Sequence, residues 1–256
     1  MKDIFTAFFM SWGMFLSVPC PVRRWDDRLR NLMLLCLPFT GLIIGGLWAL
    51  AAVLLTKARC PLLLRAGLIC FLPHVLSGFM HLDGFMDCAD AILSRRDAET
   101  KLKILKDSHV GSFAVISVVI LALLDFSAAA SLFPPENASG LEYTVFLRKA
   151  LALIFIPAAS RSCSVFSLFF FRPLSHSSYS SMSKKGKIAA AVIMAAFSLA
   201  PVFIIGPSGF SCIAVSAVSM LFVYFGIRNL GGMSGDISGL AITAGELSGL
   251  ISLSFL

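Results

Sequence analysis

Charged residues are scarce in this chain. Asp, Glu, Lys and Arg together make up 14% of its 256 residues, whereas soluble domains usually carry about 25%. Hydrophobic residues instead reach 58%, and the mean hydropathy is +0.89. This balance excludes an ordinary water-soluble domain. It predicts a single membrane-embedded domain, residues 1–256, that crosses the bilayer several times.

Several motifs of known enzyme classes are also missing. The seven cysteines form no Cys-x-x-Cys pair, so we interpret them as small core residues, neither a disulfide framework nor a zinc site. The sequence has no His-Glu-x-x-His, no Walker phosphate loop and no Gly-x-Ser-x-Gly. Any phosphoryl chemistry must therefore use a preactivated substrate. The first twenty residues lack the pattern of a cleaved signal peptide, so we expect none.

Long apolar runs predict an all-α, polytopic membrane bundle of about seven spans, because each run is close to the ~20 residues that cross a bilayer core. We expect the spans at residues 32–55, 62–80, 110–133, 149–171, 188–206, 210–228 and 237–256. Residues 4–21 are apolar but short, and would lie in the interface or re-enter the bilayer. The serine-rich stretch 175–183 is predicted to be a flexible loop.

The loops between these runs orient the bundle. Residues 95–106 and 172–187 are rich in Lys and Arg, whereas residues 134–145 carry two glutamates and no base. The positive-inside rule then places the basic loops on the cytoplasmic side. Residues 57–65 do not fit this rule, because their bases would lie on or near the outer side. Either the span count is wrong in this region or the bases snorkel. The net charge of +7 comes from short clusters between apolar spans, which argues against nucleic-acid binding.

The few acids are concentrated in residues 81–90, HLDGFMDCAD. Asp83, Asp87 and Asp90 are spaced so that their carboxylates share one face of a helix. Carboxylates about 6 Å apart repel by roughly 2–3 kcal/mol per pair at an effective dielectric near 20, so the crowding calls for a cation. Oxygen ligands suit a hard divalent ion, with Mg2+ the first expectation and Mn2+ the second. The alternative is a polar loop whose acids face water.

Bases follow the acids directly. Arg95, Lys106, Asp107 and Ser108 lie nearest to the acids or next to a glycine turn. They are candidates for binding a phosphate ester, since Arg and Lys neutralise phosphate oxygens that a metal does not bridge. The alternative is that the basic run only fixes the topology, and we prefer that interpretation for its middle lysines.

A second polar segment, residues 229–239, holds four glycines between Gly231 and Gly239. Asn229, Gly231 and Gly232 are candidates for ligand binding, because glycines let the backbone approach a ligand closely and consecutive amides can form an anion nest. Asp236 would cap the last helix or bind a second metal. With the spans above, this segment and the acids fall on the same side of the membrane.

Two ionisable residues, Arg161 and Glu246, lie inside predicted spans. Each charge costs at least ~2.5–3.5 kcal/mol at mid-bilayer, so each needs a partner or a watery cavity. Arg161 would pair with Glu246 or with a substrate phosphate. We interpret His74, within a span, as a core histidine. His81, at the membrane edge, is a candidate for proton transfer or phosphate contact.

Together these motifs resemble the cobalamin synthase family of integral-membrane adenosylcobinamide-GDP ribazoletransferases, over nearly the whole chain. The segments that carry the resemblance are FLSVPCP (15–21), HLDGFMDCADA (81–91), KDSHVG (106–111), SR (160–161) and GGMSGDISG (231–239) with Glu246. The chain departs from the family pattern at Ser17-Val18, where Thr-Arg is usual, and at His109 and Ala114, where Arg and Gly are common.

The resemblance implies a reaction. GDP-activated adenosylcobinamide would be joined to α-ribazole or its 5′-phosphate, releasing GMP and forming adenosylcobalamin or its 5′-phosphate. Mg2+ on Asp83, Asp87 and Asp90 would bridge the diphosphate. One of the acids, with Asp90 preferred over Asp83, or else His81, would accept the hydroxyl proton.

Arg95, Lys106 and Arg161 would hold phosphates in this reaction, and the glycine segment with Asp236 would close the site. The resemblance also implies a prokaryotic cytoplasmic (inner) membrane, a cytoplasmic-face active site and contact with membrane lipid. It leaves open a homo-oligomer or an association with other cobalamin-assembly enzymes.

Two rival functions remain at this point. A CDP-alcohol-type phosphotransferase also uses spaced aspartates, but its Asp-Gly-x-x-Ala-Arg start is absent. An ion-coupled transporter would use Arg161 and Glu246, but would be expected to place its acids near mid-bilayer.

Overall fold

The computed structural model describes residues 2–135, 137–174 and 183–256. Over these ranges the chain is helical and forms no strand, apart from one isolated parallel bridge between Pro173 and Met233. The all-α prediction is therefore confirmed. The helices are α1 (Lys2–Phe15), η1 (Asp27–Leu29), α2 (Arg30–Leu35), α3 (Leu37–Lys57), α4 (Leu62–Leu76), α5 (Met80–Leu93), α6 (Ala98–Ile104), α7 (Ser112–Ala130), α8 (Gly140–Phe170), α9 (Lys184–Ile205), η2 (Gly206–Gly209), α10 (Phe210–Leu230) and α11 (Gly235–Phe255). The predicted serine-rich loop lies almost entirely outside the described residues.

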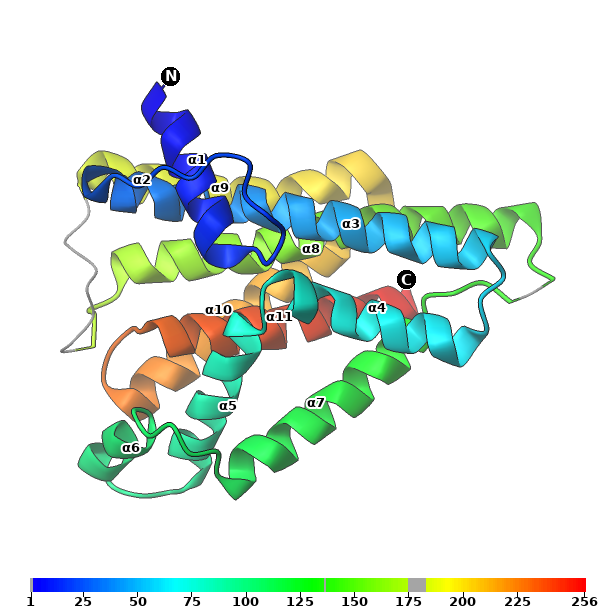
Figure 1. Ribbon diagram of the computed structural model, residues 1–256. Helices are drawn as coiled ribbons and strands as arrows, with labels where there is room; N and C mark the ends of the chain where they lie inside the picture. The colour runs from blue at the N-terminus through cyan, green and yellow to red at the C-terminus, as the bar shows by residue number, and fades with distance from the viewer. Residues whose placement is uncertain (1, 136, 175–182) are drawn as a thin grey trace.

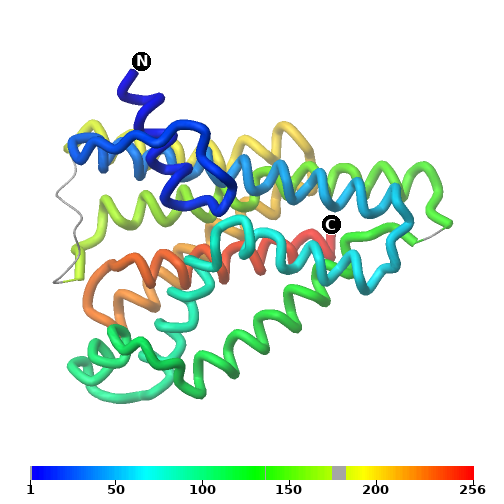
Figure 2. Tube along the Cα trace, viewed as in Figure 1, coloured from blue at the N-terminus to red at the C-terminus, as the bar shows by residue number. Residues whose placement is uncertain are grey.

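Five helical stretches are long and apolar enough to cross a membrane: α3, α7, α8, the run from α9 to α10, and α11. The bent pair of α4 and α5 raises the number to six if it counts as one span. The sequence predicted seven, because it treated 188–206 and 210–228 as separate spans. By length and composition alone they count as one 47-residue stretch, although α9 and α10 are separate helices. It folds back at η2, so that Ser198 Oγ and Ser216 Oγ lie 2.6 Å apart (Figure 2).

The predicted span at 62–80 ends early. After α4, Gly78 (φ 61°) and Phe79 (φ 60°) adopt left-handed conformations, and α5 leaves at 91° to α4. The N-terminal segment supports this bend: Ser17 N donates to Leu76 O at 2.8 Å, and Ser17 Oγ donates to Val75 O at 2.6 Å. Carbonyls at a helix end need such partners, so Ser17 satisfies backbone groups that the bend leaves open.

Helices α8 and α11 form the centre of the bundle. In the most apolar 18-residue segment of each helix, 72% of the residues are buried. The corresponding share is 28% in α7 and 17% in the α9–α10 run. Helix α3 packs closely on α8, since a Cβ added to Gly41 would lie 2.6 Å from Pro157 O. Small residues allow such close approach between membrane helices. The outer helices present their leucines, isoleucines and phenylalanines outward, as expected beside lipid.

The connections gather at two ends of the bundle (Figure 1). Helix α6 and the α10–α11 connection lie at one end, on the left of the view. The α3–α4 and α7–α8 connections lie at the other end, on the right. The expected separation of the basic loop 95–106 from the 134–145 loop is therefore confirmed, and the bases of residues 57–65 lie with the latter.

Candidate active site

The three acids lie on one helix, as predicted. Asp83, Asp87 and Asp90 all belong to α5, within about 60° of one another around its axis at 100° per residue. Asp83 is exposed, Asp87 is half-buried and Asp90 is buried. Neither Asp83 nor Asp87 has a hydrogen-bond or ion-pair partner in the described part of the chain.

Helix α11 adds a fourth carboxylate to this face. Gly84 and Gly239 let α5 and α11 touch: a Cβ at Gly84 would lie 2.9 Å from Asp236 Cα, and one at Gly239 would lie 3.1 Å from Gly84 Cα. The contact brings Asp236 beside the α5 acids, and the charges of Asp83, Asp236 and Asp90 all act on Asp87. The sequence predicted only that these two distant segments fall on the same side of the membrane, and the structure brings them into direct contact. We call Asp83, Asp87 and Asp236 the acid face.

Asp236 does not cap its helix. The N-cap of α11 is Ser234, whose Oγ accepts from Ile237 N at 3.3 Å and donates to Asp236 Oδ2 at 3.3 Å. Asp236 therefore sits in the first turn, where the helix dipole favours a negative charge. The sequence left two roles for Asp236, capping the last helix or binding a second metal, and the structure excludes the capping role.

Asp90 makes a contact that the sequence did not suggest. Its Oδ2 accepts from Gly111 N at 2.5 Å and its Oδ1 from Ala114 N at 3.0 Å. Gly111 is the N-cap position of α7 and has no side chain to cap with. Asp90 therefore serves as the cap of α7 from another helix, and its two oxygens are committed to backbone amides. This placement does not favour its predicted roles as metal ligand and proton acceptor.

His81 lies on the opposite side of α5 from the acids, by helical geometry. Its side chain is buried, and its Nε2 has no hydrogen-bond partner in the described part of the chain. The nearby charges are those of Arg161 and His74. His74 Nε2 lies 3.6 Å from Asp125 Oδ2, so His74 is a partnered core histidine, as expected. His81 faces the bundle interior, which does not favour proton transfer at the acid face.

Arg161 pairs with Glu246, the first of its two predicted partners. Arg161 Nη1 donates to Glu246 Oε1 at 2.5 Å and to Pro157 O at 3.1 Å. Ser160 Oγ also donates to Glu246 Oε1, at 3.0 Å. Arg161 is fully buried, so its guanidinium is not accessible to a substrate phosphate in this conformation. The pair joins α8 to α11 across the bundle centre.

The predicted phosphate contacts lie on exposed backbone near the acid face. Arg95 follows α5 with φ 53°, a left-handed conformation that a non-glycine residue adopts at a cost of about 1–2 kcal/mol. Lys106 and Ser108 are exposed in the α6–α7 connection. Asp107 Oδ1 accepts from His109 N at 3.0 Å and lies 2.6 Å from His109 Nδ1. These bonds lower the pKa of Asp107. The carboxylate of Asp107 is therefore already bonded within its own loop.

Asn229 and the glycines are also placed at this end. Asn229 Oδ1 accepts from Lys101 Nζ at 3.1 Å and thereby ties α10 to α6. This gives Lys101 a structural role beyond topology. Gly231 (φ 90°) ends α10 in a left-handed conformation that favours glycine. Gly232 is buried, and a Cβ there would lie 2.8 Å from Leu174 N. Glycine is therefore required at 232 by the protein's own packing.

The segment after α8 was missed as part of the site. Met233 N donates to Arg172 O at 2.8 Å, and Leu174 N donates to Met233 O at 2.9 Å. This bridge fixes the glycine turn and brings Arg172, which the sequence analysis counted only as a topology residue, to the same end. The signal available was Arg172-Pro173 at the end of a span, since proline stops a helix and the next base then stays at the membrane edge.

The donor set fits a hard cation in chemistry, although not as a closed cage. In the described residues, no three His, Cys, Asp or Glu side chains stand close enough together to hold a metal ion as placed. The acid face nevertheless provides carboxylates only, and no cation of the described residues pairs with Asp83 or Asp87. Oxygen donors of this kind match Mg2+, which usually keeps several waters and takes only one or two protein carboxylates.

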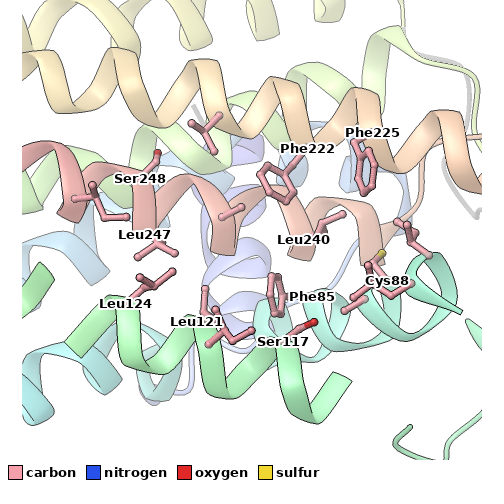
Figure 3. A pocket seen from close by; sticks show the side chains of 17 residues that line it. Phe85, Cys88, Ser117, Leu121, Leu124, Phe222, Phe225, Leu240, Leu247 and Ser248 are labelled. Carbon is pink, nitrogen blue, oxygen red and sulfur yellow. The ribbon is translucent and has the colours of Figure 1, made fainter. Parts of the chain in front are cut away.

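A separate apolar cavity lies behind the acid face. Its volume is about 420 Å³, and residues of α5, α7, α10 and α11 line it. Figure 3 shows Phe85 and Cys88 of α5 lining it together with Leu121, Phe222 and Leu240. These α5 residues point away from the acids by helical geometry. The cavity and the acid face therefore lie on different sides of α5.

Comparisons with known proteins agree with the motifs. The model of the cobalamin-5-phosphate synthase family matches residues 7–254. An adenosylcobinamide-GDP ribazoletransferase of Clostridium perfringens (strain 13 / Type A) is 38% identical, with 100% of both chains covered. One of Clostridium botulinum (strain Alaska E43 / Type E3) is 36% identical, with 98% of both covered. One of Halalkalibacterium halodurans is 43% identical over 47% of this chain and 46% of its own. No solved structure matches the chain.

Proposed function

The chain belongs to the cobalamin-5-phosphate synthase family, and on this premise we propose how its acid face serves the reaction that its relatives' name describes. The protein is a multi-pass membrane transferase of cobalamin biosynthesis. It joins GDP-activated adenosylcobinamide to α-ribazole, or to α-ribazole 5′-phosphate, and releases GMP. The product is adenosylcobalamin or its 5′-phosphate.

The observation that supports the site is the meeting of α5 and α11 at Gly84 and Gly239, which gathers Asp83, Asp87 and Asp236. We propose that these three carboxylates, in place of the expected Asp83, Asp87 and Asp90, hold Mg2+. A divalent cation held by these residues would act as a Lewis acid and would neutralise negative charge that develops on the departing GMP. Asp90 instead positions the start of α7.

The transfer step itself and the remaining contacts to phosphate can then be assigned to residues of the chain. The ribazole hydroxyl oxygen bonds to the phosphorus that bears cobinamide, and the bond from that phosphorus to the GMP oxygen breaks. The hydroxyl proton passes to a carboxylate of the acid face, for which we propose Asp83, so this residue would both bind the metal and accept the proton. Asp83 is exposed and has no protein partner among the described residues. Arg95 and Lys106 hold phosphate oxygens from exposed positions beside α5. Arg172 joins them from the segment that fixes the glycine turn.

We also place the acid face at the cytoplasmic side of a prokaryotic inner membrane. The basic loop 95–106 lies at that end, and short basic loops stay in the cytoplasm. A GDP-activated substrate made in the cytoplasm would then reach the acids without crossing the bilayer.

The experiment is a GMP-release assay on the purified protein in lipid nanodiscs. The enzyme is freed of metal with a chelator, given a GDP-activated corrinoid and α-ribazole, and then resupplied with Mg2+ or Mn2+. We expect no turnover without metal and recovery with Mg2+. Full turnover after chelation would reject the metal assignment. A CDP-alcohol in place of the corrinoid should release no nucleotide.

A further inference from the structure

A polar pocket lies at the opposite end of the bundle from the acid face. Its volume is about 460 Å³, and it lies between the α3–α4 connection and the α7–α8 connection. Three of its lining side chains are bases: Lys57, Arg59 and Arg65. No acid is found in its lining within the described residues. These bases lie on the side of the membrane where the positive-inside rule disfavours them, so their position calls for another explanation.

Arg65 is the central observation. Its side chain is only 6% exposed, and its Nε is buried without a hydrogen-bond partner in the described part of the chain. Its guanidinium stacks on Phe133 with Cζ 4.8 Å from the ring centroid. A buried guanidinium with no anion nearby is costly, because its lost hydration is not replaced. The pocket therefore contains a cation that no described residue compensates.

Glu142, a described acid at the start of α8, does not compensate it. Glu142 forms a capping box at the start of α8, where its Oε2 accepts from Ser139 N at 2.6 Å. Lys57 and Arg59 make no ion pair in the described part of the chain. Three positive charges thus converge on one pocket with no described counter-charge, which suits an anion with several oxygen atoms.

The surface beside the pocket is strongly apolar. Leu54 at the end of α3 and Leu62, Leu63 and Leu64 at the start of α4 are 55%, 44%, 66% and 55% exposed. Arg65 follows these leucines directly. A ligand with a phosphate and attached acyl chains would place its phosphate among the bases and its chains along the leucines. Basic pockets beside membrane helices are known to bind anionic lipid headgroups.

We propose that this pocket binds the phosphate of an anionic phospholipid, with Arg65, Arg59 and Lys57 around the headgroup and the acyl chains along the α3 and α4 leucines. The inference is independent of the proposed transfer reaction, because it concerns the other end of the bundle. It also explains why a cluster of bases is kept on the side that the positive-inside rule disfavours.

The test measures lipid bound to the purified protein by native mass spectrometry, after exchange into detergent containing phosphatidylglycerol. The two key variants are Arg65→Gln and Arg59→Gly. Arg59 has φ 53°, a conformation that glycine adopts freely, so Arg59→Gly removes the charge without disturbing the turn. We expect each to weaken binding about tenfold, the change that loss of one charge-assisted contact gives. Lys103→Gln, which removes a base at the acid-face end, should bind as the parent does.

Two further measurements separate the sources of the anion. Inorganic phosphate should not displace the lipid, because it lacks the chains that lie on the leucines. If phosphate binds equally well, or if Lys103→Gln weakens lipid binding as much as Arg59→Gly does, the proposal is wrong. Glu136 adjoins the lining in sequence but lies outside the described residues. Glu136→Gln should leave lipid binding unchanged, and a marked gain would show that the chain's own carboxylate competes for the pocket and would overturn the assignment.

Discussion

Two groups of carboxylates in this molecule differ in whether the fold provides them with a partner. At the bundle centre, Glu246 is paired with Arg161, and Asp125 lies near His74. At the acid face, Asp83 and Asp87 have no cationic partner among the described residues, although Asp236 and Asp90 are near enough for their charges to act on Asp87. The buried acids are compensated within the fold, whereas the acid face is not.

The difference separates structure from chemistry. An ionisable group inside a membrane bundle needs an internal partner to be tolerated, so the Arg161–Glu246 pair follows from folding alone. Uncompensated acids at a helix edge destabilise the fold slightly and would be kept for a ligand. If this is correct, changing the acid face should alter activity and spare stability, and changing the buried pair should do the reverse.

The largest effect is expected for Asp83→Asn and Asp87→Asn. Each removes a charge proposed to hold Mg2+, so we expect GMP release to fall at least about a thousandfold, which corresponds to about 4 kcal/mol. The unfolding midpoint in detergent should not fall, because like-charge repulsion is relieved. Asp97→Asn is the matched control, since Asp97 is an exposed acid at the same end that caps α6, and asparagine caps equally well. Activity near the parent's in Asp83→Asn would contradict the site.

The buried pair should respond in stability. Arg161→Met leaves Glu246 without its partner, and breaking a buried pair in this way costs about 3 kcal/mol. The double variant Arg161→Met with Glu246→Met removes both charges and should recover most of that loss. Denaturant unfolding in mixed micelles measures both. If the single variant kept its stability but raised the KM for the GDP-activated substrate, Arg161 would contact phosphate, which is the alternative that the sequence left open.

The contact between α5 and α11, which joins the acid face to the bundle centre, can be loosened by the substitution Gly84→Ala. The new Cβ would lie 2.9 Å from Asp236 Cα, so α5 and α11 must separate, at a cost of about 1–3 kcal/mol. Because the acid face depends on this contact, the Mg2+ concentration for half-maximal activity should rise as well. Gly46→Ala is the control, since a Cβ there meets nothing within 4 Å. Unchanged metal dependence in Gly84→Ala would detach Asp236 from the metal site.

The sequence predicted local features of this molecule better than distant contacts. Apolar runs gave the helices, and the spacing of Asp83 and Asp87 gave a shared face, because both depend on neighbouring residues. The cost of a charge in the bilayer was sufficient to name Glu246, 85 positions away, as one of two candidate partners for Arg161. Other features depend on packing that no local pattern carries. These include the bend after α4, which Ser17 supports, and the approach of α11 to Gly84.

Asp90 gives the smallest and most discriminating prediction, because the sequence grouped it with the acid face and the structure gives it a capping role. If Asp90 only caps α7, Asp90→Asn keeps one acceptor and loses one amide contact. The expected cost is about 1 kcal/mol of stability. Activity should fall by less than about tenfold, because Lys106 and Ser108 precede α7 and would lose some order.

The metal dependence and the pH profile of GMP release should stay those of the parent in Asp90→Asn. A base or a metal ligand at this position would instead lose about a thousandfold and alter one of those profiles. That outcome would return Asp90 to the acid face and would mean that ligand binding turns its side chain away from Gly111 and Ala114. The acid face of uncompensated carboxylates would then extend one turn further along α5, to include Asp90.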